Sequence, residues 1–388
     1  MSTAATRVPE TEEQVKKQEL QQQQQQQQEE EKPQVKKNVP ADWRTKINWE
    51  RIYKYFAYFV LGLVPFFIRD MLSFREEVIS LGHDVVPWDF LLYGAIFTVV
   101  FTFIRQIFFW STHSCIHKRI LPQYQGEVRN LHTRKVQKWL FDFIYYTGTS
   151  LYGYICFKDA PWYPLSFSED TYGNATRGVL HAWPGLPVQD EYYGYFKWFL
   201  IVQLGHHTWG LLDLVIVRRK LENRYFEWLT HHLLAFTLIF YSAYFNFSIL
   251  AVAVLIIHDI GDIFLVMFKT WGEWYSRGIV FKYLVFQMIS GWFLSRVYLY
   301  PKVIIWPIII YKQLYYDHQK YFEIAFGAYI YQTLLLCCLY LLHLYWFAQM
   351  ITLLTSYIRK QLKEGRNSKQ DSGYGNEFDY VHYNKKNK

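Results

Sequence analysis

The sequence predicts an all-α, polytopic membrane protein with about eight transmembrane helices. Apolar segments of roughly 20 residues, the length that a spanning helix needs, recur from residue 53 onward. The chain is 52% hydrophobic and 20% aromatic, yet its mean hydropathy is only -0.06, because polar ends dilute the apolar body. Lys and Arg gather in short segments beside the apolar runs, as they do in loops that set membrane orientation.

Both ends of the chain differ in composition from this body. Residues 1–48 are rich in Gln, Glu and Lys and include an unbroken glutamine run from Gln21 to Gln28. They contain too few large apolar residues to offset chain entropy, so we expect a disordered tail, and we expect a second one at 359–388. Because no signal peptide pattern opens the chain, the first span is expected to serve as an uncleaved targeting signal.

Eight apolar runs between these tails are candidates for spanning helices. The first two, with the loop after them, make up residues 49–134. Pro301 and Pro307 interrupt the apolar stretch after the seventh run, which allows a kinked or re-entrant segment there. The expected spans are 53–72, 88–110, 138–157, 194–217, 225–245, 247–269, 279–300 and 326–357.

The charges of the loops predict the orientation of the spans. An even number of spans places both termini on one side, and loops rich in Lys and Arg are typically cytosolic. The basic residues that follow spans two and four are Lys118, Arg119, Arg129, Arg134, Lys135, Arg218, Arg219, Lys220 and Arg224. Both termini are therefore expected to be cytosolic.

Two short motifs bear on the compartment. Asn174 begins an Asn-Ala-Thr acceptor sequence in the acidic loop 158–193, so we expect a lumenal site that can be glycosylated, although three-residue matches also arise by chance. Lys385 and Lys386 stand fourth and third from the carboxyl end, as in the dilysine retrieval signal of the endoplasmic reticulum; a solvated basic terminus is the alternative. Together they favour a multi-pass protein of the endoplasmic reticulum membrane.

Charge and cysteine usage exclude other classes. The net charge of +8 is distributed over loops beside apolar spans, which argues against a nucleic-acid partner. Cys115, Cys156, Cys337 and Cys338 show no metal-ligand spacing and fall within or beside apolar segments, so we expect no disulfide framework.

The strongest functional signal is a set of five ionisable residues in two neighbouring spans. His231 and His232 lie roughly 10 Å inside the fifth span, and Asp262 lies at a similar depth in the sixth, which runs back. His258 and Asp259 precede Asp262 by four and three residues, so all three can share one helix face. Each ionisable group at membrane depth costs roughly 2.5 to 3.5 kcal/mol, so the cluster indicates an active site.

Histidine and carboxylate at this depth fit proton transfer or acyl transfer. An imidazole is a base near neutral pH and can attack an acyl group, and a carboxylate on its far nitrogen fixes the tautomer and stabilises the cation. Two alternatives stay open: hydrogen bonding between helices and nothing more, or a zinc or iron site.

The iron alternative rests on further histidines. His113 and His117 are spaced HxxxH, and His206 and His207 form a second pair, as in membrane desaturases and hydroxylases. Those enzymes repeat HxxHH boxes, which neither pair here completes, so we expect no metal. His206 and His207 are equally well explained as buried polar groups bonded to neighbours.

Two elements together resemble the TLC domain of ceramide synthases. The family pattern is a double His followed by an HDxSD-like element and a lysine; here the double His is His231 and His232, and the second element runs from His258 to Asp262, with Lys269 after it. Gly261 stands where the family has the serine. The resemblance covers roughly 135 to 360, assigns residues 135–358 to a TLC domain with a central cavity, and extends to Arg296, His343 and Trp346.

The resemblance implies a ceramide synthase, which moves a fatty acyl group from acyl-CoA to the amine of a sphingoid base without a cofactor. His231 or His232 would accept the acyl group or deprotonate the amine, Asp259 and Asp262 would orient and stabilise the imidazolium, and His258 would support them or relay a proton. The resemblance implies substrate binding by Arg296, His343 and Trp346.

Arg218 and Arg219 would attract CoA phosphates or serve only as orientation signals. A homodimer or a small accessory subunit fits the family. The alternative function is a non-catalytic TLC protein that handles lipids or membrane proteins in the endoplasmic reticulum.

Overall fold

The structure is a computed structural model, and its described residues form helices and no strand. It describes residues 49–62, 68, 72–73, 75–76, 79–80, 88–122, 124–165, 193–217, 225–245, 247–274, 278–310 and 319–364. The segments named below belong, apart from Trp49, to the unit Glu50–Lys388. They are α3 (Trp49–Gly62), α5 (Trp88–Arg119), α6 (Gly126–Phe157), α7 (Tyr193–Leu212), η2 (Asp213–Val217), α8 (Tyr225–Tyr244), α9 (Ser248–Trp274), α10 (Gly278–Trp292), η3 (Phe293–Ile305), α11 (Trp306–Ile310) and α13 (Gln319–Glu364).

A helical segment overlaps each of the eight expected spans, and among the residues that the structure describes five helices are long and apolar enough to cross a membrane. These five lie in α5, in α7 with η2, in α9, in α10 with η3, and in α13. The all-α membrane fold is thus confirmed. The helices α3, α6 and α8 cover the other three expected spans, and the expected span 53–72 continues beyond α3 into residues that are only partly described.

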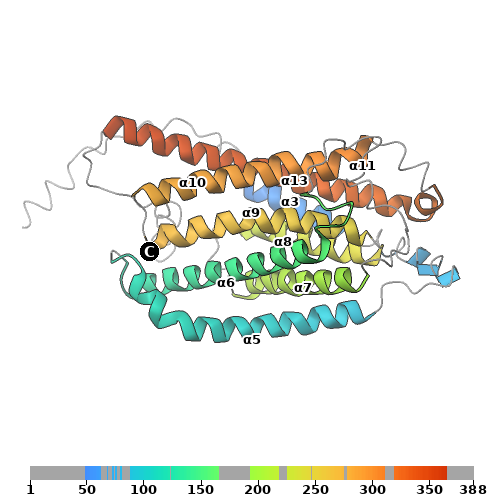
Figure 1. The fold of residues 1–388 in the computed structure, drawn as a ribbon, viewed down its shortest axis with the longest axis horizontal. Coiled ribbons are helices and arrows are strands. Elements are labelled where there is room, and N and C mark those ends of the chain that lie inside the picture. The colour runs from blue at the N-terminus through green and yellow to red at the C-terminus, as the bar shows by residue number, and fades with distance from the viewer. Residues whose placement is uncertain are drawn as a thin grey trace, which may run out of the picture. The chain divides into compact units, whose positions relative to one another are not determined.

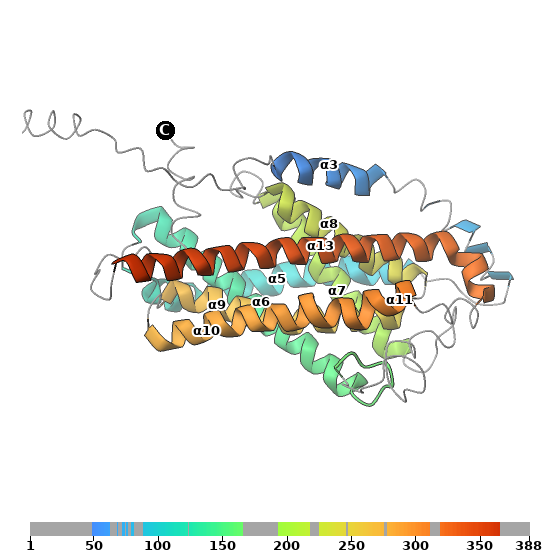
Figure 2. The same cartoon turned by 90° about the horizontal axis from the view of Figure 1, so that it is seen from above.

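Helix α9 is the centre of the bundle, with α6, α7, α8, α10 and η3 packed around it (Figures 1 and 2). Its residues Ile249–Ile257 are buried without interruption, as expected for a helix that is apolar on every side. Outer helices show the opposite pattern. Phe103, Ile107 and Trp110 on α5 are exposed, and this apolar surface is suited to lipid.

Glycines allow close helix crossings in this core. A Cβ added at Gly205 of α7 would lie 2.6 Å from Phe97 of α5, and one at Gly153 of α6 would lie 2.9 Å from Ile256 of α9. Small residues at such points let two backbones approach, which is how helices associate in lipid. The first contact holds α7 against α5, and the second holds α6 against the central helix α9.

Several helices extend beyond their expected spans, and the structure gives a physical reason for two of these extensions. Helix α6 begins at Gly126 because polar residues in its first turns, among them His132, Thr133 and Gln137, are buried in the bundle. The segment with Pro301 neither breaks nor re-enters: α10 continues through η3, a π-helical stretch, into α11. There the Trp306 N–H donates to the Pro301 carbonyl five residues back, the wider π spacing.

Candidate active site

A cavity of about 1550 Å³ runs through the bundle and contains most of the expected site residues. Helices α5 to α9, α10 with η3, and α13 contribute to its wall. The expected site residues that line it are His231, His232, His258, Asp259, Asp262, Arg296 and Trp346.

Four expected site residues do not line the cavity or lie outside the described residues. His343 does not line the cavity and instead contacts His258. Arg218, Arg219 and Asn174 lie outside the described residues, so their roles stay predictions.

The paired histidines lie in the wall that α8 presents to the cavity. Their ring centroids are 5.5 Å apart, and the Trp346 ring lies 5.1 Å from that of His231. Gly210 of α7 makes room for the second ring, since an added Cβ would lie 3.0 Å from His232 Cε1. Nδ1 of His231 is buried and has no hydrogen-bond partner among the described residues. Both rings are therefore presented to the cavity by close packing.

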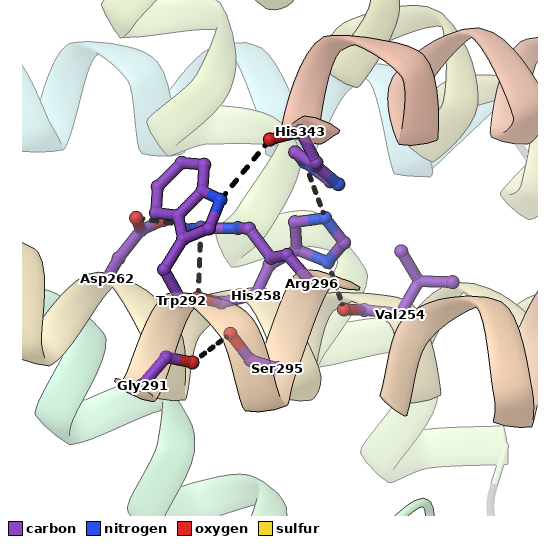
Figure 3. A network of polar contacts seen from close by, with 8 residues as sticks. All are labelled: Val254, His258, Asp262, Gly291, Trp292, Ser295, Arg296 and His343. Carbon is purple, nitrogen blue, oxygen red and sulfur yellow. Dashed lines mark hydrogen bonds and ion pairs between the residues drawn. The ribbon is translucent and has the colours of Figure 1, made fainter. Parts of the chain in front are cut away.

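His258 on α9 is fixed by two hydrogen bonds (Figure 3). Its Nδ1 lies 2.7 Å from the Val254 carbonyl oxygen, which is an acceptor only, so Nδ1 carries the proton in neutral His258. Its Nε2 is then an acceptor for the Nε2–H of His343, 3.2 Å away. The two rings form a dyad with a defined tautomer, in which His343 supports His258 from α13.

Asp262, which is half-buried, forms an ion pair with the buried Arg296 rather than with the paired histidines. The Asp262 Oδ1 to Arg296 Nη2 distance is 2.7 Å, and Arg296 Nη2 also donates to the His258 carbonyl oxygen at 3.2 Å. The guanidinium lies 4.0 Å from the Trp292 ring centroid, a cation–π contact. Figure 3 shows Arg296 tying α9 to η3.

Gly261 makes this ion pair possible. An added Cβ would lie only 2.5 Å from the Ser295 hydroxyl oxygen and 3.6 Å from Arg296 Nη1. Ser295 donates to the Gly291 carbonyl at 2.7 Å and so occupies the space beside Gly261. Because Gly261 stands where the family pattern has a serine, η3 can approach α9 closely.

Asp259 faces α6 and α7. Its Oδ2 accepts hydrogen bonds from Thr149 Oγ1 and from Gln203 Nε2, both at 2.6 Å, and the residue is 2% exposed. Tyr145 donates to Gln203 Oε1 at 2.9 Å and extends the network. The expectation that Asp259 and Asp262 both orient a paired histidine therefore differs from the structure, because each carboxylate is held by another helix.

Sequence reasoning missed Tyr145, Thr149 and Gln203, the polar residues that hold Asp259. Thr149 lies four residues after Tyr145, and His207 four after Gln203, so each pair shares a helix face, a signal available in the sequence. His206 and His207 both line the cavity, and the His206 ring stacks on Tyr145 with centroids 3.7 Å apart. They belong to the site and not only to the helix packing.

Trp346 is held by a buried acid. Its Nε1–H donates to Glu227 Oε1 at 2.5 Å, and its ring lies 5.8 Å from those of Trp228 and Trp292. This aromatic cluster covers the side of His231 that faces α13. Bulky, rigid rings at that place exclude water from the histidine.

The cavity is cationic at one end and apolar at the other. Arg134, Lys135, Lys138 and Lys269 line the end where α6 begins and α9 ends, and exposed Arg134 shows that the cavity reaches the surface there. Lys138 pairs with Asp142 at 2.7 Å. The opposite end is lined mainly by aliphatic side chains of α8, α9 and α13: Leu238, Ile239, Ala251, Leu336 and Leu339.

Within the described part of the chain, no three His, Cys, Asp or Glu side chains gather as metal ligands would. The rings of His113 and His117 stack at 5.5 Å, and His117 Nδ1 lies 3.2 Å from the Thr133 hydroxyl. These contacts account for that pair without a metal.

Comparison with known proteins agrees with the earlier resemblance. The TLC domain of the TRAM_LAG1_CLN8 family matches residues 135–352. Similar proteins include Ceramide synthase 1 LOH3 of Arabidopsis thaliana, 29% identical over 43% of this chain and 54% of its own length, and human Ceramide synthase 3, 25% identical over 64% and 58%.

A tomato protein, Alternaria stem canker resistance protein 1 of Solanum lycopersicum, is 25% identical over 75% of this chain and 91% of its own length. The chain spans about half the length of the ceramide synthases it matches. These findings confirm the similarity to ceramide synthases.

Proposed function

Because the chain belongs to the TLC-domain family, we propose that it is a ceramide synthase. It transfers a fatty acyl group from acyl-CoA to the amine of a sphingoid base in the endoplasmic reticulum membrane. The observation that carries this proposal is the order of groups along one cavity: cations at one end, paired histidines in the middle and an aliphatic wall at the other end.

This order matches the parts of an acyl-CoA molecule. The phosphates of CoA carry negative charge and would bind beside Arg134, Lys135, Lys138 and Lys269. The acyl chain would lie against the aliphatic wall, where burial removes it from water. The thioester that joins the two parts would then lie beside His231 and His232.

Two balanced reactions are open to the paired histidines. In the first, a neutral imidazole attacks the thioester carbon and the C–S bond breaks, which leaves an acyl-imidazole and the CoA thiolate. The ammonium of the sphingoid base loses one proton to water, the resulting amine displaces the imidazole, and the thiolate takes the second proton from the amine nitrogen as the amide forms. In the second, the imidazole takes a proton from the ammonium, the amine attacks the thioester directly, and the thiolate takes the proton lost as the amide forms. Both require a neutral imidazole beside the carbonyl.

The surrounding polar groups would position the reacting ones. The Asp262–Arg296 pair and the His258–His343 dyad hold α9, η3 and α13 in register beside the cavity. Asp259, which lines the cavity and lies in a network of hydrogen bonds, places negative charge near the amine and the developing imidazolium.

The test uses the purified full chain in lipid discs with acyl-CoA and sphinganine. Release of free CoA together with ceramide, measured by mass spectrometry, supports the enzyme, and lipid binding without CoA release supports the alternative, a non-catalytic lipid-handling protein. Separate His231→Ala and His232→Ala variants should abolish ceramide formation. His117→Ala, outside the cavity, is the matched control, and full activity in both cavity variants would refute the proposal.

A further inference from the structure

The aliphatic end of the cavity is closed by a polar pair from two helices. Ser242 on α8 and Gln332 on α13 both line the cavity, and Gln332 Nε2 donates to Ser242 Oγ at 2.7 Å. Their exposed fractions are 1% and 3%. The other side chains of this part of the wall are aliphatic. The hydrogen bond between Ser242 and Gln332 therefore lies where an acyl tail would end.

Gln332 also separates the cavity from a second space. A narrow pocket beyond it is lined by Phe247, Leu250, Ile308, Tyr329, Gln332, Thr333 and Leu336. Gln332 and Leu336 therefore contact both spaces. The pocket itself is too narrow to hold a water molecule, so removing the Gln332 side chain would lengthen the main cavity only by the space that this side chain fills.

We propose that Ser242 and Gln332 form the end wall of the acyl tunnel and set the longest acyl chain that the protein accepts. This inference rests on the proposed acyl transfer and adds the substrate class: fatty acyl chains of intermediate length. Extending a tail past the wall would break the hydrogen bond between the two side chains and leave their polar atoms unpaired beside hydrocarbon. An apolar wall would lack that resistance.

The helix geometry gives the length of this tunnel. Ser242 follows His231 by 11 residues on α8, a rise of about 16 Å, and Gln332 precedes Trp346, which contacts His231, by 14 residues, about 21 Å. An extended chain advances about 1.2 Å per single bond, so these distances hold roughly 13 to 17 bonds. The expected optimum is an acyl chain of about 16 carbons.

The test is the acyl-CoA length profile of the purified full chain in lipid discs, with sphinganine as acceptor. Thioesters from about 12 to about 24 carbons bracket the estimated tunnel. The unmodified protein should lose about tenfold in kcat/KM two carbons beyond its optimum. Gln332→Ala should shift the optimum to longer chains, and Ser242→Phe should shift it to shorter ones.

Controls separate this proposal from the proposed function. Thr333→Ala removes a side chain that lines only the narrow pocket and should leave the profile unchanged. Thermal stabilisation by the same thioesters reports chain-length selection even if no ceramide forms. The absence of ceramide would then refute only the acyl transfer.

Gln332→Leu serves where Gln332→Ala fails to fold, because a branched apolar side chain keeps the wall filled and still removes the hydrogen bond. An unchanged length profile in the Gln332 and Ser242 variants would overturn the end-wall assignment.

Discussion

His258, Asp259 and Asp262 occupy one short stretch of α9, yet each contacts a different helix. His258 meets α13, Asp259 meets α6 and α7, and Asp262 meets η3. As their spacing in the sequence predicted, all three belong to one site, since they line the same cavity as the paired histidines. The spacing could not predict the partners, because these come from residues far apart in the chain, Thr149 and Arg296 among them.

The Asp262–Arg296 pair predicts non-additive effects on stability. Asp262→Ala or Arg296→Ala alone leaves one charge without its partner, which costs about 3 to 5 kcal/mol for a buried pair. Removing both in Asp262→Ala/Arg296→Ala should cost clearly less than the two single effects added together. Unfolding of the four proteins in one detergent, followed by temperature, measures this, and strict additivity would show that the pair does not couple α9 to η3.

The charge of Asp259 can be tested without disturbing its hydrogen bonds. In Asp259→Asn the amide oxygen can still accept from Thr149 and Gln203, so the midpoint of thermal unfolding should change little. If the negative charge stabilises the developing cation, kcat should fall by about tenfold or more, equivalent to ~1.4 kcal/mol in the barrier. An unchanged kcat would mean that the carboxylate serves packing alone.

At the scale of helices, the apolar runs of the sequence predicted where the helices lie better than where they begin and end. A helix overlaps each of the eight apolar runs, because a span of about 20 apolar residues has few other stable states. The start of α6 escaped prediction because its polar side chains, such as Gln137, are satisfied by α5 and not by lipid. Pro301 likewise suggested a kinked or re-entrant segment, but the helix continues past this proline as a π-helical stretch.

The crossing of α5 and α7 depends on Gly205. An added Cβ would lie 2.6 Å from Phe97 Cβ and 3.1 Å from its backbone carbon, contacts that a rotamer change cannot relieve. Gly205→Ala should therefore destabilise the fold by about 1 to 3 kcal/mol. Gly148→Ala on α6 is the matched control, since an added Cβ there meets nothing within 4 Å and alanine favours a helix. Equal unfolding temperatures of the two variants would contradict close packing at this crossing.

At the scale of the whole molecule, basic residues that the sequence predicts on the cytosolic side also line one end of the cavity. The sequence predicted the basic segments and their cytosolic side, but the cavity is formed by helices from across the bundle, so its cationic end could be identified only in three dimensions. Arg134 and Lys135 were predicted as orientation signals, and in the structure they also line the cavity. The same residues would set orientation and receive CoA.

Charge reversal at this end should weaken acyl-CoA binding selectively. In Arg134→Glu and Lys135→Glu the phosphates of CoA meet a repulsive field, so KM for acyl-CoA should rise by about 5-fold or more at low salt, with kcat little changed. The effect should shrink as salt is added, because about 0.15 M salt screens charges beyond roughly 8 Å. Lys158→Glu reverses an exposed charge just after the other end of α6 and is the matched control. A similar rise in KM in the control would mean that net charge, and not this end of the cavity, governs the encounter with acyl-CoA.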